Sequence, residues 1–142
     1  MSSEILEPVN VNKKFSQTAE AVFDAWLKPE IVCQWMFVGP NNKILHVHID
    51  ERIGGKFSIL ELSDTGEKID HYGEYFIIDK PHELSFTLQV PRHFPGVTHV
   101  SIKLAPLASG CLLQFTQTGI DRKVIEQNWK DMFDKLAEVL DK

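Results

Sequence analysis

An amphipathic stripe near the C-terminus constrains the fold of this chain more than any other feature. From Asp121 onward, apolar side chains recur every three or four residues, and charged residues fill the positions between them. The stripe consists of Ile125, Trp129, Met132, Leu136 and Leu140, and Phe133 and Ala137 widen it. This spacing predicts one long helix. Because one face of that helix is apolar, it must lie on another apolar surface, which we predict to be a sheet.

Six predicted strands supply that sheet. Turns containing Gly, Pro or Asp separate them, and they occupy residues 44–52, 56–63, 68–79, 83–91, 97–105 and 111–118. Apolar and polar residues alternate clearly in three of these strands. The apolar sets are Leu45, Val47 and Ile49; Leu84, Phe86, Leu88 and Val90; and Val100, Ile102 and Leu104. Such alternation predicts an antiparallel sheet with one face on the core and one face in water.

The first 35 residues add a strand and two short helices. Residues 5–15 predict the strand, and Thr18 is the expected N-cap of a helix whose apolar residues include Val22 and Trp26. Pro29 ends that helix and begins a second one that runs to Trp35. We therefore predict an α+β fold in one domain spanning 1–142. In it a curved antiparallel sheet wraps around the long C-terminal helix, an arrangement that often leaves a cavity between the two.

Composition and charge exclude several classes of partner. The net charge is −5, and no cluster of Lys and Arg offers the surface that phosphate backbones require, so nucleic acid is not an expected partner. No apolar run approaches the ~18 residues of a membrane span, and the first residues do not resemble a secretory signal. The two cysteines, Cys33 and Cys111, imply no disulfide framework and are expected to be small buried side chains. We expect a cytoplasmic protein.

The segment HVHIDERIGGKF, residues 46–57, raises the question of a metal site. His46, His48 and Asp50 lie at alternate positions and would share one face of a strand. The opposite face is apolar, however, so the face with these three residues is expected to be in water, and we predict no metal and no cofactor. Gly54 and Gly55 are expected to bend the chain, and Asp50 and Arg52 to form a surface ion pair.

Several segments together resemble a known family. They are FSQTAEAVFDAWLKPEIVCQWM, IDERIGGKF, HYGEYFIIDKPHELSFT and WKDMFDKLAEVL, and they cover nearly the whole chain. Their order and spacing resemble the START-like superfamily with its helix-grip fold. Within it, they resemble homologues of the C-terminal domain of the activator of the ninety-kilodalton heat-shock chaperone's ATPase. Two positions depart from the pattern: Met36 replaces the second Trp of a Trp pair, and Asn128 replaces a Gly before Trp129.

The predicted function is non-enzymatic binding of a small hydrophobic molecule between the sheet and the last helix. Apolar and aromatic walls with a few polar groups suit such a site. The candidate wall residues are Trp35, Phe37, Phe57, Ile59, Phe76, Phe86, Leu88, Trp129 and Phe133. Tyr72 and Glu74 are the candidate polar groups, because they share a strand face with Phe76 and Ile78 and would point inward if those two do. The other reading of Glu74 places it at a solvated strand end.

Two further classes of function stay open. The resemblance implies an interaction module that contacts a chaperone, although the full co-activator also carries an N-terminal chaperone-binding domain that these residues do not match. Relatives in the superfamily include cyclases and hydrolases, but the sequence offers no recognisable set of acid, base and nucleophile, so no catalytic residue is predicted. A homodimer also stays open.

Overall fold

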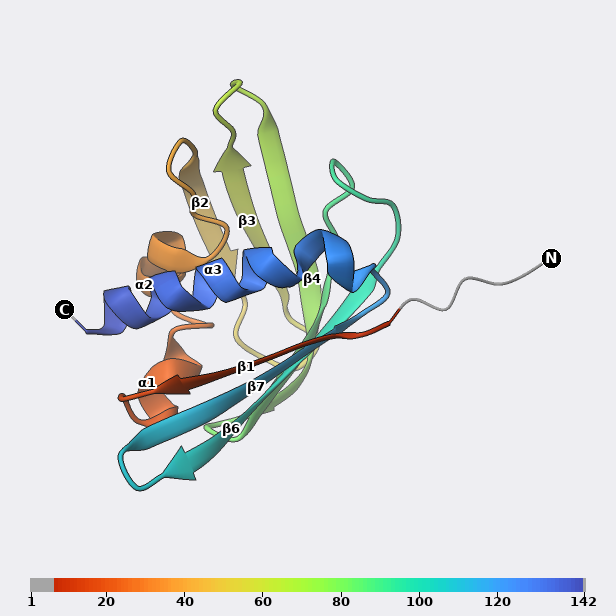
Figure 1. Ribbon diagram of the computed structural model, residues 1–142. Coiled ribbons are helices and arrows are strands. Elements are labelled where there is room, and N and C mark those ends of the chain that lie inside the picture. Colours follow the sequence, from red (N-terminus) through yellow and green to blue (C-terminus); the bar gives the residue numbers. More distant parts are fainter. Residues whose placement is uncertain (1–6, 142) are drawn as a thin grey trace.

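The computed structural model describes residues 7–141 and shows a seven-stranded antiparallel sheet with three helices (Figure 1). Its elements in chain order are β1 (Val9–Phe15), α1 (Ala19–Asp24), α2 (Pro29–Trp35), β2 (Lys43–Ile49), β3 (Lys56–Leu62), β4 (Lys68–Asp79), β5 (Glu83–Leu88), β6 (Thr98–Leu107), β7 (Gly110–Thr118) and α3 (Arg122–Leu140). This order confirms the predicted α+β fold. The first two positions of the strand predicted at 5–15 lie outside the described residues.

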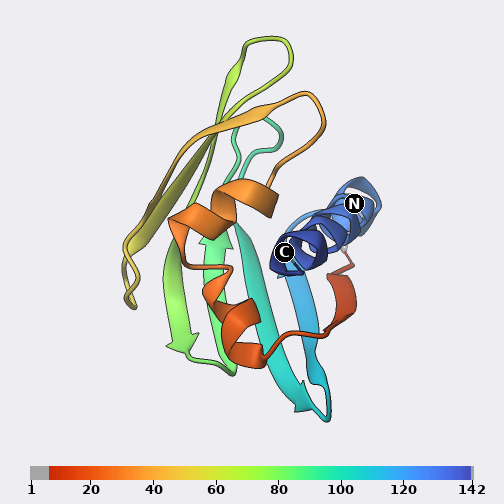
Figure 2. The same cartoon turned by 90° about the vertical axis from the view of Figure 1, so that its left-hand side faces the viewer.

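The sheet has the strand order β1-β7-β6-β5-β4-β3-β2, and every neighbouring pair is antiparallel. Figure 1 shows α3 crossing the concave side of the sheet, and Figure 2 shows the same helix almost end-on. The helix α2 packs against both α3 and β2. The sheet therefore curves around the long helix as predicted, and its two ends do not meet to close a barrel.

Local chemistry explains the short helices at the N-terminus. The Thr18 side chain accepts a hydrogen bond from the Ala21 N–H (3.2 Å), which is the predicted cap of α1. Pro29 occupies the first turn of α2, where its missing N–H costs nothing. Buried aromatic side chains join this helical region to α3 and the sheet: the ring centroids of Trp35 and Phe133 on α3 lie 6.3 Å apart, and those of Trp26 and Phe115 on β7 lie 6.4 Å apart.

A bulge in β4 reverses the face that we predicted for its polar residues. The buried side chains of this strand are Ile69, His71, Gly73 and Tyr75. The register against β5 shifts between Tyr75 and Ile77, which places one extra residue there. Ile78 packs against the core as the prediction assumed, but the extra residue changes the parity of everything before it. Tyr72, Glu74 and Phe76 consequently point to the outer face, and the inward orientation predicted for them is wrong.

A second bulge, in β2, corrects one predicted core residue. The register against β3 shifts between Ile44 and His46, so Ile44 packs against the core and Leu45 is 43% exposed. Val47 and Ile49 pack against the core as predicted. The strand ends at Ile49 rather than at residue 52, because the Arg52 N–H donates to the Asp50 carbonyl (2.8 Å) in a tight turn.

Gly73 occupies a position on β4 where no side chain fits. A Cβ atom at this position would lie 1.8 Å from the Thr87 carbonyl oxygen on β5, which is far inside contact distance. The backbones of β4 and β5 approach so closely here that only glycine fits. His71 and Tyr75, on either side of Gly73, consequently lie on the inner face close to β5.

Candidate functional site

A cavity of about 780 Å³ lies between α3 and the inner face of β3, β4 and β5. The loop between α2 and β2 and the loop between β5 and β6 complete its wall, through residues such as Phe37 and Phe94. On α3 the wall is formed by Ile125, Trp129 and Met132. The exposed area of its wall is mostly apolar, and the polar residues in the wall are Asn42, Glu61, His71, His93, Gln117, Asp121, Asn128 and Asp131. The volume falls in the range of about 300–1,000 Å³ that is usual for pockets that bind small molecules.

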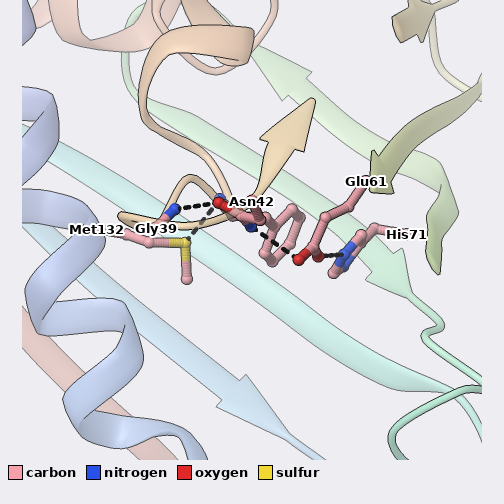
Figure 3. Close-up of polar contacts among 6 residues, drawn as sticks. Gly39, Asn42, Glu61, His71 and Met132 are labelled. Atoms are coloured by element: carbon pink, nitrogen blue, oxygen red, sulfur yellow. Dashed lines mark hydrogen bonds and ion pairs between the residues drawn. The ribbon is translucent and has the colours of Figure 1, made fainter. Parts of the chain in front are cut away.

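Three polar side chains form a connected group in this wall (Figure 3). The His71 Nε2 atom lies 2.8 Å from Oε1 of Glu61, and the Asn42 side-chain amide donates to Oε2 of the same carboxylate (2.7 Å). A carboxylate can only accept hydrogen bonds, so Nε2 of His71 carries the hydrogen in this pair. Both oxygens of Glu61 therefore have a donor, and the imidazole is held in one tautomer.

The loop 37–42 is tied to the same group. Asn42 donates to the Phe37 carbonyl (2.8 Å) and accepts from the Gly39 N–H (2.6 Å). The Phe37 N–H donates to the sulfur of Met132 on α3 (3.2 Å). Phe37 has a φ of 61°, a left-handed conformation that is uncommon for a bulky residue. These contacts hold the loop in place between β3 and α3.

The ring of Phe37 stacks on the ring of His71. Their centroids are 3.8 Å apart and their planes differ by 15°. Phe37 also contacts Trp129 edge-on, with centroids 5.9 Å apart. A half-buried aromatic side chain thus covers the imidazole on the side of α3 and the loop.

His71 is a buried histidine with one unpaired ring nitrogen. Its side chain is only 4% exposed, and Nδ1 has no hydrogen-bond partner. Burial lowers the pKa of His71 below its ordinary value, and the hydrogen bond and charge of Glu61 oppose that shift without cancelling it. The neutral ring with Nε2–H directed at Glu61 presents Nδ1 as a free acceptor.

A buried chain of hydrogen bonds runs along another side of the cavity. The Trp129 indole N–H donates to the Gln117 side chain (2.8 Å), and the Gln117 amide donates to the Thr98 hydroxyl (2.9 Å). Thr98 in turn donates to the Leu88 carbonyl (2.7 Å). Because each of these polar side chains has a partner, this chain fixes the orientation of Trp129 and stabilises the wall.

The eleven predicted wall and polar residues fall into four groups. Phe37, Leu88 and Trp129 line the cavity. Phe57, Ile59 and Phe86 line an adjacent void of only about 10 Å³, which shares Phe37, Leu88 and Trp129 with the large cavity. Trp35 and Phe133 have no exposed surface and belong to the solid core, where the Trp35 indole donates to the Ala25 carbonyl.

The fourth group lies on the outer face of the sheet. Phe76 is 48% exposed, and its ring lies near that of His99 on β6, with centroids 6.1 Å apart. Tyr72 and Glu74 share this face and line neither the cavity nor the void. The polar side chains of β3 and β4 that line the cavity are Glu61 and His71, which were not among the candidates predicted from the sequence. One signal was present: His71 alternates with Ile69 and Tyr75, which are apolar enough to mark an inner face.

The HVHIDERIGG segment lies away from this cavity. The side chains of His46 and His48 are exposed, as predicted for the wet face of β2, and Arg52 pairs with Asp50 at 2.8 Å. Gly54 has a positive φ of 83° in the turn between β2 and β3, which agrees with the predicted bend. Within residues 7–141, no group of three or more His, Cys, Asp or Glu side chains is arranged to hold a metal ion.

The two cysteines differ in exposure. Cys111 is buried as expected, but Cys33 on α2 is exposed, so the expectation that it is buried is wrong.

None of the described helices is both long enough and apolar enough to cross a membrane. Comparison with known protein families gives a match between residues 16–141 and the family described as Activator of Hsp90 ATPase homolog 1-like protein. No curated protein matches the chain.

Solved bacterial structures share the fold at low sequence identity. A protein from Chromobacterium violaceum is 23% identical, with a TM-score of 0.81 over 95% of this chain and 97% of that one. An Activator of Hsp90 ATPase homolog 1-like protein from Aeromonas hydrophila is 19% identical, with a TM-score of 0.83 over 95% and 92% of the two chains. A Staphylococcus aureus protein of unknown function is 20% identical, with a TM-score of 0.74 over 95% and 93%. The chain belongs to the family of Activator of Hsp90 ATPase homolog 1-like proteins, within the START-like superfamily.

Proposed function

We propose that this protein binds a small, largely apolar molecule in the cavity between α3 and the sheet. The observation that carries the proposal is the cavity itself, about 780 Å³ with a mostly apolar wall. The cavity opens to solvent, since exposed residues such as Pro40 and Asp121 are part of its wall, so a ligand has a path into it. Hydrophobic ligands are also common among proteins with this fold.

The composition of the wall supports binding rather than a packing defect. Phe94, in the loop between β5 and β6, and Ile125 and Met132, on α3, offer apolar contact, and His71 and Glu61 place polar groups on one side. An apolar body surrounded by such side chains is removed from water, at about 25 cal/mol for each Å² of apolar surface buried. The few polar groups would orient the ligand. Glu61 and His71, in place of the predicted Tyr72 and Glu74, are therefore the polar groups that we expect to contact the ligand.

A fluorescence titration with 2-methoxynaphthalene, an uncharged apolar probe, tests the proposal. We expect saturable binding at one site per chain. The variant Ile125→Trp places a larger side chain in the cavity from α3 and should weaken binding at least tenfold. Lys130→Trp adds the same side chain on the exposed side of the helix and serves as the control. Equal binding by the wild type and both variants would place the probe elsewhere and would contradict the proposal.

Native mass spectrometry of gently purified protein adds an independent test. A co-purified apolar molecule would support the proposal and would identify a ligand class directly. Elemental analysis of the same sample covers the alternative: zinc or iron at one equivalent per chain would show that the protein holds a metal, contrary to our prediction.

A further inference from the structure

We infer that the ligand is an uncharged molecule with an apolar body and one hydroxyl group, and that this hydroxyl donates a hydrogen bond to Nδ1 of His71. The inference rests on the proposed function, because it assumes that the cavity is a binding site. It adds the chemical class of the ligand and the atom that recognises it.

Nδ1 of His71 is a hydrogen-bond acceptor without a partner. His71 lines the cavity, is 4% exposed, and has no hydrogen-bond partner at Nδ1, while its Nε2–H is committed to Glu61. Buried polar atoms in proteins nearly always have a partner, and one that lacks it lowers stability. A donor carried by the ligand satisfies this atom. The protein thereby gains a hydrogen bond on binding that it does not have when it is empty.

The polar group of the ligand must match this unpaired acceptor in its number of hydrogen-bond donors. Nδ1 of His71 is the one buried atom of this polar group without any partner, because each oxygen of the Glu61 carboxylate already accepts from His71 or from Asn42. A hydroxyl group brings one hydrogen, which matches one acceptor. An ammonium group brings three hydrogens and a charge, and that charge would have to give up its hydration to reach an atom of a residue that is only 4% exposed. The arrangement therefore favours an alcohol or a phenol over an amine.

The charges in the cavity wall restrict the charge that the ligand can carry. The cavity wall includes the carboxylates of Glu61, Asp121 and Asp131, and no Lys or Arg is among the described residues that line it. Burial also disfavours the protonated form of His71, so the imidazole supplies no positive charge at neutral pH. A carboxylate or phosphate on the ligand would meet negative charges without a cation to pair with. The site consequently discriminates against fatty-acid anions and phosphate esters.

Phe37 covers one face of this imidazole. Its ring stacks on the imidazole at 3.8 Å, and Nδ1 has almost no contact with solvent. The backbone of Phe37 is in the left-handed region, at φ 61°, which costs more for a bulky residue than an ordinary conformation does. The side chain is half-buried rather than locked in the core. Because Nδ1 has almost no solvent contact, a hydroxyl group of the ligand reaches it only after a local movement of the cavity wall.

Three probes with the same ring system test the inference by fluorescence titration at neutral pH. They are 2-naphthol, which has a hydroxyl donor, 2-methoxynaphthalene, which has none, and 2-naphthoate, which is an anion. We expect 2-naphthol to bind about three- to tenfold more tightly than the ether, the size of one neutral hydrogen bond. We expect 2-naphthoate to bind the most weakly of the three.

Two variants on the same strand locate the effect. His71→Phe keeps an aromatic ring and removes the acceptor, so it should abolish the preference for 2-naphthol over the ether. Tyr72→Phe, whose side chain lies on the outer face, should keep the full preference. If His71→Phe does not fold, the nitrogen chemical shifts of wild-type His71 replace it: 2-naphthol should shift the Nδ1 resonance and 2-methoxynaphthalene should not.

The outcomes separate the two proposals. Failure of all three probes to bind the wild-type protein would contradict the proposed function and, with it, this inference. Equal affinity for 2-naphthol and the ether would overturn the inference and leave the proposed function standing. The inference would also be overturned if 2-naphthoate bound more tightly than the other two probes, or if His71→Phe kept the preference for 2-naphthol over the ether. An Nδ1 resonance that does not shift with 2-naphthol would overturn it as well.

Discussion

The two halves of α3 lie on different surfaces, although one continuous apolar stripe runs along both. In the N-terminal half, Ile125 and Trp129 border the cavity. In the C-terminal half, Phe133 and Leu136 have no exposed surface and pack into the solid core. The periodicity of the stripe indicates only which side chains turn away from water. Whether they meet packed atoms or an empty space depends on the curvature of the sheet opposite them.

The largest expected effect is at Trp129, the residue that joins the two halves. It is 2% exposed, packs against Phe115 and Phe133, and also lines the cavity. Trp129→Ala should lower the free energy of unfolding by ~3–5 kcal/mol, because it removes a large buried ring and leaves the Gln117 side chain without its donor. Urea denaturation measures this change. A loss below about 1 kcal/mol would mean that the ring contributes little packing and that the cavity extends around it.

A matched pair on the same helix sharpens the comparison. Leu136→Ala, in the solid core, should cost ~3 kcal/mol. Met132→Ala, beside the cavity, should cost about half as much, because the removed atoms already border empty space and leave fewer contacts to lose. Both values come from denaturant midpoints at a fixed m-value. Equal losses at the two positions would break the distinction between the halves of the helix.

The pH dependence of stability tests the state of His71. Its folded-state pKa is lowered, first by burial, so the unfolded chain binds this proton more readily than the folded chain does. Stability from this group is therefore present above the ordinary pKa of 6.5 and is lost as the pH falls from there toward the lower folded-state value. His71→Phe should flatten this part of the profile. Substitution of the exposed His48 by Gln is the control, and an identical flattening by both variants would contradict the assignment to His71.

The smallest expected effect is on a chaperone. We expect no stimulation of the ATPase of a cognate Hsp90-type chaperone when the protein is added at micromolar excess. The reason is that the apolar stripe of α3 is buried against the sheet, while its outer face carries charges of both signs, such as Lys130 and Asp134. A several-fold increase in turnover that is lost on charge reversal of this face would favour an interaction module over a ligand-binding protein.

The order of strands and helices was predictable from the sequence because each element follows a regular period. The alternation around Leu84 and Phe86, the Thr18 cap and the stripe of α3 all agree with the structure. The polar part of the site was not predictable in the same way. A single extra residue in β4 changes the parity between Ile78 and Tyr72, and nothing in the local pattern shows that the strand contains a bulge.

The contacts among His71, Glu61 and Asn42 could not be predicted from the sequence, for a different reason. These residues come from β4, β3 and the loop after α2, and they meet only because β3 pairs with β4 and the loop folds over both. No spacing in the sequence encodes such a contact between elements. Phe37 was predicted as an apolar wall residue, but its stacking on His71 depends on a left-handed backbone conformation that its residue type does not suggest.

The central claim is that the cavity beside the N-terminal half of α3 is a binding site, and methyl-labelled NMR with 2-methoxynaphthalene tests it most directly. We expect nuclear Overhauser contacts between the probe and the methyl groups of Ile125, Leu88 and Val90, which line the cavity. Ile102, which is buried in the core away from the cavity, should show none. Contacts that map instead to the exposed Ile77 on the outer face, or no contacts with any methyl group at saturating probe, would contradict the account.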